Sequence, residues 1–451
     1  MSNRFCRMGF VRALSEPLSG AFVDALVDVF ARASSGALTG AFIGVIAGTM
    51  TLAPHAALAQ EPFPDLQVLA SALSRFPISD EARFAGQGWA AIESANAELA
   101  QREVGHFEGA PTGWFDRPVR IHHRAYVLPP ETEKGAAVIV PGFTEGQVIY
   151  QEVIHDLLRN GWSVYIIDHR NQGFSTRLIE GDNGRDKGHL DRFERLVSDL
   201  DRFVEHVRQS RQDPARSERP LVLLAHSMGG TVSALLLARQ GAETPFKAAA
   251  LVTPMMEPTV APASSAQWGD RALRRWCHAG SMPFIFELPG LSSMRGQGGN
   301  FEQEWRRYRE MLDRSTHPQT HSVVRHDMRW LNRASRCEGE HCGHDDAKVA
   351  GATLGWVDEA CGGAAQARGP DAARITVPVL VLQGGEDTVV EPDAQQEFCE
   401  HVNAGKPQDS PGRCTGWRLP ESRHGMLLEV DRLRRPALVE ILTFWEAAAA
   451  R

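Results

Sequence analysis

Short runs of consecutive apolar residues alternate along the chain with longer segments in which apolar residues recur every three or four positions. The apolar runs are read as strands at 121–128, 136–140, 163–168, 221–224, 247–252, 375–382 and 416–419. The helical periodicity falls at 149–160, 192–209, 228–238 and 433–449. Strands that alternate with helices predict an α/β fold, in which a mostly parallel central sheet carries helices on both faces.

Two segments interrupt this alternation and divide the chain. Residues 60–115 are expected to form an N-terminal helical lead-in. Residues 254–373 hold five of the ten tryptophans and read as a partly helical, loop-rich insert. We interpret this insert as a lid over the strand ends, placed before the last strands. The α/β core is then formed by residues 116–253 and 374–451.

The first 59 residues have the pattern of a secretory signal peptide. No charged residue occurs from Ala33 to Gln60, arginines lie upstream, and Ala57-Leu58-Ala59 matches an A-x-A cleavage site. We therefore expect cleavage after Ala59 and an exported protein, periplasmic or secreted. The alternative is an uncleaved membrane anchor, because the uncharged span is long enough to cross a bilayer.

Cysteine usage agrees with export. Six of the seven cysteines remain after residue 59, and an even number in an exported chain suggests disulfide bonds. Cys399 and Cys414 are the preferred pair, because both lie in the last core segment on either side of a Gly/Pro loop. Six free, buried thiols are the alternative.

One stretch combines a strand, a tight turn and a helix around a serine. Leu221 to Leu224 is the strand, and Ala225-His226-Ser227-Met228-Gly229 matches the G-x-S-x-G nucleophile elbow with alanine in place of the first glycine. Such an elbow exposes the serine Oγ and places the next backbone N–H at a helix N-terminus, where it can meet developing negative charge. Ser227 is therefore the candidate nucleophile, and an ordinary serine at a helix start is the alternative.

A serine nucleophile needs a base and a residue that orients the base. Asp387 follows the strand 375–382 and is the preferred acid, with adjacent Glu386 as the alternative. His424 follows the last strand, so the chain order Ser…Asp…His is the one expected for this architecture. His226 is the competing base, although the elbow should turn its side chain away from the Ser227 hydroxyl.

The developing oxyanion needs two hydrogen-bond donors. We expect the Met228 N–H to be one of them, and the Phe143 N–H, in the loop after the strand 136–140, to be the other.

No cofactor and no metal are expected. His341, Cys342, His344 and Cys337 could bind zinc, but their spacing matches no standard structural site. A net charge of −8 and a pI near 6.1 give no electrostatic basis for binding nucleic acid. Within the insert, acidic residues roughly cancel the arginines, so the charge count there does not define a substrate.

The chain resembles the α/β-hydrolase superfamily, and more closely its bacterial lysophospholipase and monoacylglycerol lipase branch, over roughly residues 115–450. The likeness is carried by segments 166–175, 188–193, 224–230, 306–308 and 326–331, and by those around Asp387 and His424. Pro141 departs from the histidine that many relatives have there, and 337–361 looks like an addition. The resemblance implies hydrolysis of an acyl ester by a serine nucleophile without a cofactor.

These observations lead us to expect a serine hydrolase that cleaves an amphiphilic acyl ester, a lysophospholipid or a monoacylglycerol, with transient contact to a membrane surface. The alternatives are a short-chain carboxylesterase on the same scaffold and a catalytically inactive binding protein with this fold. The sequence does not define the oligomeric state.

Overall fold

We describe the protein from a computed structural model. It describes residues 62–85, 88–112, 118–179, 184–262, 264–283, 286–288, 290–296, 298–335 and 347–451. The expected signal peptide, residues 1–59, lies outside this part of the chain, as do Cys337, Cys342 and the histidines considered as zinc ligands.

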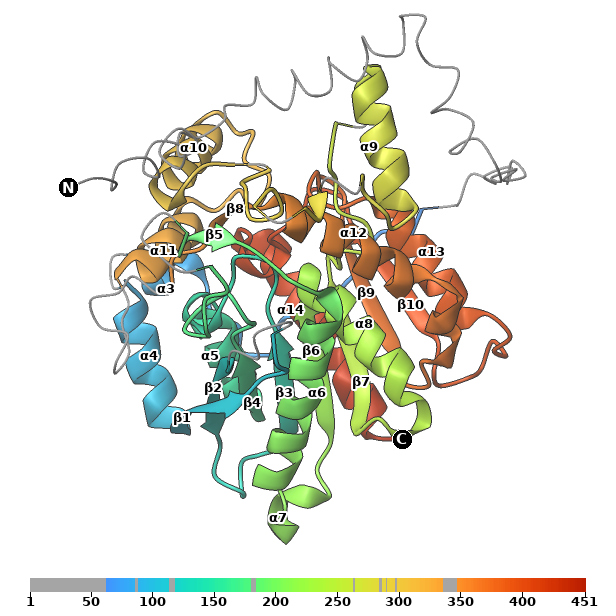
Figure 1. The fold of residues 1–451 in the computed structure, drawn as a ribbon. Helices are drawn as coiled ribbons and strands as arrows, with labels where there is room; N and C mark the ends of the chain where they lie inside the picture. The colour runs from blue at the N-terminus through green and yellow to red at the C-terminus, as the bar shows by residue number, and fades with distance from the viewer. Residues whose placement is uncertain are drawn as a thin grey trace, which may run out of the picture. The chain divides into compact units, whose positions relative to one another are not determined.

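An eight-stranded sheet with the order β1-β2-β4-β3-β6-β7-β9-β10 forms the centre of the described chain (Figure 1). The strands are β1 Gln101–Glu108, β2 Arg120–Val127, β3 Gly135–Val140, β4 Trp162–Ile167, β6 Leu221–His226, β7 Phe246–Val252, β9 Val379–Gly384 and β10 Cys414–Leu419. Strand β2 pairs antiparallel with both β1 and β4, and every other pairing in the sheet is parallel. The mostly parallel sheet predicted from the sequence is confirmed.

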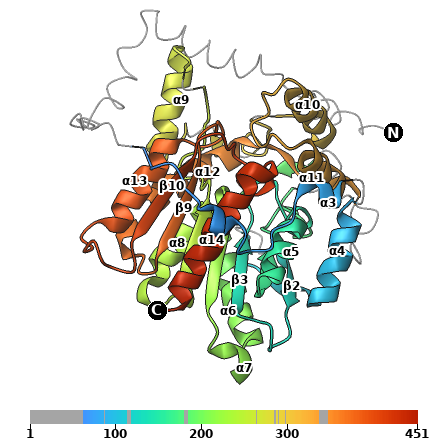
Figure 2. The same ribbon diagram turned by 180° about the vertical axis from the view of Figure 1, so that it is seen from behind.

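Helices cover both faces of the sheet. They are α2 Ala70–Leu73, α3 Glu81–Phe84, α4 Gly88–Leu99, α5 Gln151–Arg159, α6 Phe193–Ser210, α7 Pro214–Ser217, α8 Met228–Gln240, α9 Trp268–His278, α10 Phe301–Asp313, α11 Val323–Ser335, α12 Leu354–Arg368, α13 Pro392–Asn403 and α14 Asp431–Ala449. Figure 1 shows α6 and α8 in front of the sheet, and Figure 2 shows α14 on the opposite face. Two separate apolar cores fill the two sides of the sheet.

The local patterns explain the central elements. All six residues of β3 and all six of β6 are buried, as expected for parallel strands with helices on both sides. Helix α6 buries Leu196, Leu200, Phe203 and Val207, which recur at helical spacing along one face. These elements therefore form where their apolar periodicity predicts them.

The helical lead-in expected over 60–115 is helical in part. Among its described residues α2, α3 and α4 are helices, whereas Gln101–Glu108, for which no strand was expected, forms edge strand β1. This strand is polar and partly exposed, so its local sequence carries little strand signal, and its pairing with β2 decides its conformation. At the other edge, Leu66 N–H donates to the carbonyl of Arg418 in β10, which keeps the chain extended before α2.

Between β7 and β9 the chain leaves the sheet and forms α9, α10, α11, β8 Ala350–Ala352 and α12. Figures 1 and 2 show α9, α10 and α11 beyond the end of the sheet at which the parallel strands finish. Strand β8 pairs with β5 Lys187–Gly188 in a separate two-stranded sheet. The insert thus lies over the edge where the candidate site residues were expected.

Candidate active site

The serine lies on a strained turn between β6 and α8. Ser227 has φ 53° and ψ −122°, a backbone conformation that non-glycine residues rarely adopt. A side chain at Gly229 would come within 2.1 Å of the Val140 carbonyl oxygen, so the close contact between this turn and the end of β3 requires glycine there. Ala225, in contrast, is the second-to-last residue of β6. It is buried there and has no positive φ, so its backbone does not require glycine.

Ser227, His424 and Asp387 lie in one chain of hydrogen bonds. The Ser227 Oγ lies 2.8 Å from His424 Nε2, and His424 Nδ1 lies 2.8 Å from Asp387 Oδ2. All three side chains are buried or nearly so. The structure therefore brings together, from three distant segments, the nucleophile, base and orienting acid that the sequence predicted.

The other oxygen of Asp387 is fixed by the backbone. Its Oδ1 accepts hydrogen bonds from the N–H groups of Val389 and Val390, at 2.8 and 3.3 Å. Glu386, the alternative acid, lies instead near His321 and Arg423, at 3.4 and 3.5 Å, and is half-exposed. The geometry thus favours Asp387 over Glu386 as the partner of His424.

The loop after β3 lies against the serine. A side chain at Gly142 would come within 3.0 Å of Ser227 Cβ, so the backbone around Phe143 faces the nucleophile. Within the described residues, neither the Phe143 N–H nor the Met228 N–H donates a hydrogen bond to the protein. Both predicted oxyanion donors are therefore free to bind a ligand oxygen.

Two contacts hold this loop in place. Gln172 accepts from the Thr144 N–H at 2.7 Å and donates to the carbonyls of Gly142 and Glu145. The Phe143 ring stacks on Trp356 with 4.0 Å between ring centroids. Gly188 also lies against this ring, because a Cβ at Gly188 would come within 2.1 Å of it. Gln172 lies in segment 166–175 and Gly188 in segment 188–193. Both segments carried the family resemblance in the sequence, and both contact the oxyanion loop.

Sequence reasoning missed a buried ion pair beside the triad. His226 Nδ1 lies 3.0 Å from Glu145 Oε2, and His226 Nε2 lies 3.0 Å from the carbonyl oxygen of His424. Both partners are acceptors, so both ring nitrogens carry protons and His226 is a cation. Burial opposes this charge, but Glu145 outweighs it and raises the pKa of His226. The sequence expectation that His226 turns away from the Ser227 hydroxyl agrees with these contacts.

Glu145 is the centre of several contacts. Burial alone would raise the pKa of its carboxyl, but His226 and Arg329 outweigh burial and hold that pKa far below its ordinary value. The Tyr150 hydroxyl donates to Glu145 Oε2 at 2.6 Å, and the Gly142 N–H donates to the same oxygen at 2.8 Å. The available sequence signal for this role was an acidic residue in the loop after the strand 136–140, where an oxyanion donor was expected.

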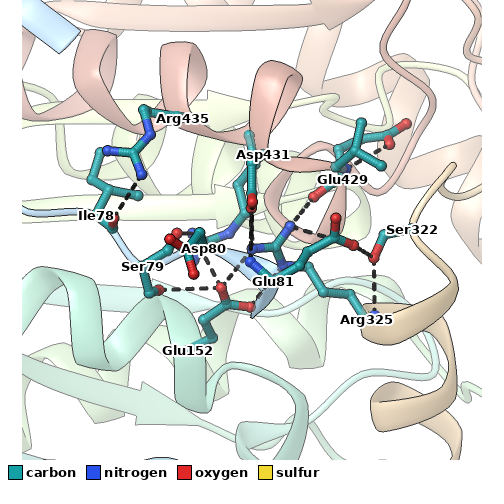
Figure 3. A network of polar contacts seen from close by, with 12 residues as sticks. Ile78, Ser79, Asp80, Glu81, Glu152, Ser322, Arg325, Glu429, Asp431 and Arg435 are labelled. Carbon is teal, nitrogen blue, oxygen red and sulfur yellow. Dashed lines mark hydrogen bonds and ion pairs between the residues drawn. The ribbon is translucent and has the colours of Figure 1, made fainter. Parts of the chain in front are cut away.

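Helix α11 of the insert is fixed to the core by Arg325 (Figure 3). The Arg325 guanidinium donates to Glu152 on α5 and to Asp431 at the start of α14, each at 2.7 Å, and to the Glu429 carbonyl. Ser322, just before α11, hydrogen-bonds Glu81 of α3. These contacts hold α11 over the site.

A cavity of about 260 Å³ opens above the Ser227–His424 pair. Its lining includes the oxyanion loop and comes largely from the insert, with residues of α10 and α11, the segments before and after them, and Trp356 of α12. The lining residues from the insert include Tyr308, His317, His326, Arg329, Trp330, Arg333 and Trp356. A substrate ester that reaches Ser227 must therefore pass along a wall of arginine, histidine and aromatic side chains.

Apart from Trp356, which stacks on Phe143, the tryptophans of the insert divide into two groups. Trp305 and Trp330 stack in parallel at 6.4 Å and pack with Phe301, so they form the insert's own small core. Trp268 and Trp276 on α9 are 62% and 41% exposed. The second pair is thus available to contact another surface.

Disulfide bonds join Cys399 to Cys414, as the sequence favoured, and Cys277 of α9 to Cys361 of α12.

Among the described residues, no helix is both long enough and apolar enough to span a bilayer. In the same part of the chain, no group of histidine, cysteine and acidic side chains is arranged to hold a metal.

The fold and the site define an α/β-hydrolase with a serine elbow, and comparison with known proteins identifies the family. Residues 131–430 match the family described as serine aminopeptidase, S33, to which the chain belongs. The chain is 30% identical over 367 residues to lysophospholipase L2 of Escherichia coli (strain K12), covering 79% of this chain and 94% of that protein. The probable lysophospholipase L2 of Haemophilus influenzae is 24% identical over 354 residues, covering 75% of this chain and 93% of that protein.

Solved structures share the fold. A monoglyceride lipase from Saccharomyces cerevisiae superposes with a TM-score of 0.54 at 14% identity, covering 78% of this chain and 96% of the other. A lipase in its open form gives a TM-score of 0.51 at 16% identity, covering 77% of this chain and 100% of the other. The chain is therefore a hydrolase of the serine type, with the mostly parallel sheet expected from its sequence.

Proposed function

We propose that the protein hydrolyses the carboxylic ester of an amphiphilic acyl substrate, a lysophospholipid or a monoacylglycerol, through an acyl-enzyme on Ser227. The observation that carries this proposal is the hydrogen-bond chain from Ser227 Oγ through His424 to Asp387, 2.8 Å at each step. The names of the E. coli relative and of the yeast lipase support the substrate class.

In this mechanism His424 removes the hydroxyl proton while Ser227 Oγ attacks the ester carbonyl carbon. The oxyanion of the tetrahedral intermediate accepts hydrogen bonds from the Phe143 and Met228 N–H groups. Protonated His424 then gives its proton to the leaving alcohol. A water molecule, deprotonated by His424, cleaves the acyl-enzyme and releases the fatty acid. Asp387 keeps the His424 ring in the tautomer that presents Nε2 to the serine.

Labelling tests the nucleophile. A fluorophosphonate probe should label the protein, and Ser227→Ala should abolish the label while the variant keeps its melting temperature. Labelling that survives in Ser227→Ala would contradict the assignment, and absence of labelling in the wild type would favour the binding-protein alternative.

A substrate panel tests the chemistry. Lysophospholipids and monoacylglycerols with the same acyl chain should be cleaved with higher kcat/KM than short p-nitrophenyl esters. Much faster turnover of the short esters would indicate the carboxylesterase alternative. Aminoacyl p-nitroanilides serve as the control for peptidase activity, and we expect no turnover because a cavity wall rich in arginine repels a free amino terminus.

We further propose that the protein is exported after cleavage behind Ala59. Two disulfide bonds support an oxidising compartment. Mass spectrometry of the mature protein should find an N-terminus at Gln60, and an intact segment 1–59 would indicate the anchor alternative.

We propose that α9 makes the transient contact with a membrane surface. Trp268, Ala272 and Trp276 recur every four residues along one helix face, and Arg271 and Arg275 lie beside them. Exposed tryptophan with flanking arginine suits the interface of an anionic bilayer. The double variant Trp268→Ala/Trp276→Ala should sediment less with phosphatidylglycerol vesicles than the wild type, and equal sedimentation would contradict the proposal.

A further inference from the structure

Three arginines, Arg325, Arg329 and Arg333, follow one another at four-residue intervals along the buried face of α11. They are 1%, 8% and 1% exposed, so all three charges are largely removed from water. A buried charge is costly unless an opposite charge or hydrogen-bond partners compensate it. An arginine on this face that lacks an opposite charge in the protein could bind an anionic ligand.

The compensation decreases along the helix. Arg325 has three carboxylates within ion-pair distance: Glu152 and Asp431, each at 2.7 Å, and Glu81 at 3.9 Å. Arg329 has Glu145 at 3.4 Å, and that carboxylate is shared with the cationic His226. Arg333 has no carboxylate within ion-pair distance among the described residues. All three arginines line the cavity, and the uncompensated positive charge increases along α11 from Arg325 to Arg333.

Arg333 is held in place but is not neutralised. Its Nη1 donates to the carbonyls of Thr144 and Val349 at 3.1 and 3.0 Å, and its guanidinium lies 4.2 Å from the Trp330 ring centroid. Its Nε has no hydrogen-bond acceptor in the described part of the chain. Burial, with repulsion from Arg329, lowers the pKa of Arg333, as expected of a poorly compensated cation.

His317 offers a second donor to the same cavity. Its Nδ1 accepts from the N–H groups of Gln319 and Thr320, so in the neutral ring the proton is on Nε2. Burial, with the neighbouring charges of His326 and Arg329, lowers the pKa of His317 to about 3, which keeps the ring neutral. Nε2 is buried and has no hydrogen-bond partner among the described residues.

We infer that this part of the cavity binds the phosphate of a lysophospholipid head group, with Arg333 and Arg329 supplying the charge and the His317 Nε2–H a further hydrogen bond. Arginine presents several N–H donors in a planar fork that matches phosphate oxygens. The site adjoins the oxyanion loop, because Arg333 binds the carbonyl of Thr144, next to Phe143. The short glycerol unit that joins ester and phosphate in a lysophospholipid suits this proximity.

This inference rests on the proposed function, since it selects lysophospholipid over monoacylglycerol as the preferred substrate. The Glu304 carboxylate, which also lines the cavity, does not cancel the charge, because it binds the Gly299 N–H and lies 3.5 Å from Arg307.

The first test compares two substrates with the same acyl chain, lysophosphatidylglycerol and monoacylglycerol. Arg333→Met loses its hydrogen bond to Thr144 with either substrate. It should also lower kcat/KM for lysophosphatidylglycerol on the order of 10- to 100-fold more than kcat/KM for monoacylglycerol, the added effect of losing one charge-assisted hydrogen bond to phosphate. Arg333→Lys should retain part of the preference for lysophosphatidylglycerol over monoacylglycerol. The matched control is Arg306→Met, which replaces an exposed arginine on α10 and should leave kcat/KM for both substrates unchanged. An equal effect on both substrates, or none, would overturn the inference.

The second test does not depend on turnover or on the folding of the variant. Calorimetry of the wild-type protein should detect saturable binding of sn-glycerol 3-phosphate and none of glycerol. Absence of binding would overturn the phosphate site even if both lipids are cleaved. Inorganic phosphate that binds as tightly as sn-glycerol 3-phosphate would overturn its assignment to a lipid head group. Binding without cleavage of any lipid would instead contradict the proposed function and leave the anion site supported.

Discussion

The imidazole of His226 lies 3.0 Å from the backbone carbonyl oxygen of His424, with its Nε2–H directed at that oxygen. The residue before the nucleophile therefore holds the backbone of the proposed base. Its other nitrogen binds Glu145, which receives the Gly142 N–H of the oxyanion loop. One buried ion pair thus connects the elbow, the histidine loop and the oxyanion loop.

Replacing Glu145 by glutamine should weaken all three connections. Removing one partner of a buried ion pair typically destabilises a protein by about 3–5 kcal/mol, and we expect a loss of that order in chemical denaturation, together with a lower kcat. Glu98→Gln, an exposed glutamate on α4, is the matched control and should change stability by less than about 0.5 kcal/mol. A variant as stable as the wild type would contradict the role of the pair.

The pH dependence of this effect follows from the two pKa shifts. Glu145 has a lowered pKa, so its contribution is fully present above its ordinary value of 4.5 and is lost as the pH falls. His226 has a raised pKa, so its contribution is fully present below its ordinary value of 6.5 and is lost as the pH rises through the raised value. The difference in melting temperature between wild type and Glu145→Gln should therefore be largest between pH 4.5 and 6.5. A difference that grows steadily toward alkaline pH would contradict this assignment.

The choice between Asp387 and Glu386 can be tested directly. Asp387→Asn should lower kcat for a p-nitrophenyl ester by about 10⁴-fold, since the amide no longer holds His424 in the required tautomer. Glu386→Gln should leave kcat within a few-fold, because Glu386 lies near His321 and Arg423 rather than His424. Reversed effects would make Glu386 the orienting acid.

The Phe143 ring offers a test of the oxyanion loop that leaves its donors intact. Gly188→Ala places a methyl group within 2.1 Å of a ring that also stacks on Trp356, so we expect the ring, and with it the loop, to shift. Loss of one oxyanion donor costs about 10²–10³-fold in rate, and we expect a decrease in kcat approaching the lower value. Gly362→Ala, a helical glycine of α12 whose added Cβ meets nothing closer than 3.5 Å, is the control and should retain full activity.

The two disulfide bonds should contribute differently to stability. Cys277 and Cys361 close a loop of 84 residues, whereas Cys399 and Cys414 close one of 15. Chain entropy predicts about 4–5 kcal/mol for the longer loop and about 3 kcal/mol for the shorter. Urea unfolding of the two double Cys→Ala variants should show the larger loss for the pair in the insert. The opposite order would indicate that native-state strain, rather than loop closure, dominates.

Much of the fold could be predicted because its central strands and helices have strong local periodicity. The elbow at Ser227 and the position of His424 after the last strand were also visible, since each is defined by its neighbours in sequence. Strand β1 could not be predicted, because its polar residues pair at an exposed edge. Local pattern does not encode pairing between distant segments.

The supporting charges of the site were also missed, for a related reason. His226 and Glu145 are 81 positions apart, and only the fold shows that they meet. The count of charges in the insert was nearly balanced, yet among the described residues Arg333 has no carboxylate within ion-pair distance, whereas Arg325 has carboxylates at 2.7 Å. Composition gives the sum of charges, and the arrangement in space decides where a surplus remains.

The pairing of β5 with β8 has a consequence for exchanging parts between relatives. Gly188, which packs against Phe143, belongs to the segment between β4 and α6, yet its strand is completed by a strand of the insert. A chimaera that replaced only residues 254–373 would join a foreign β8 to the native β5. Grafts that transfer both strands together should preserve the oxyanion loop, so the unit of exchange is discontinuous in sequence.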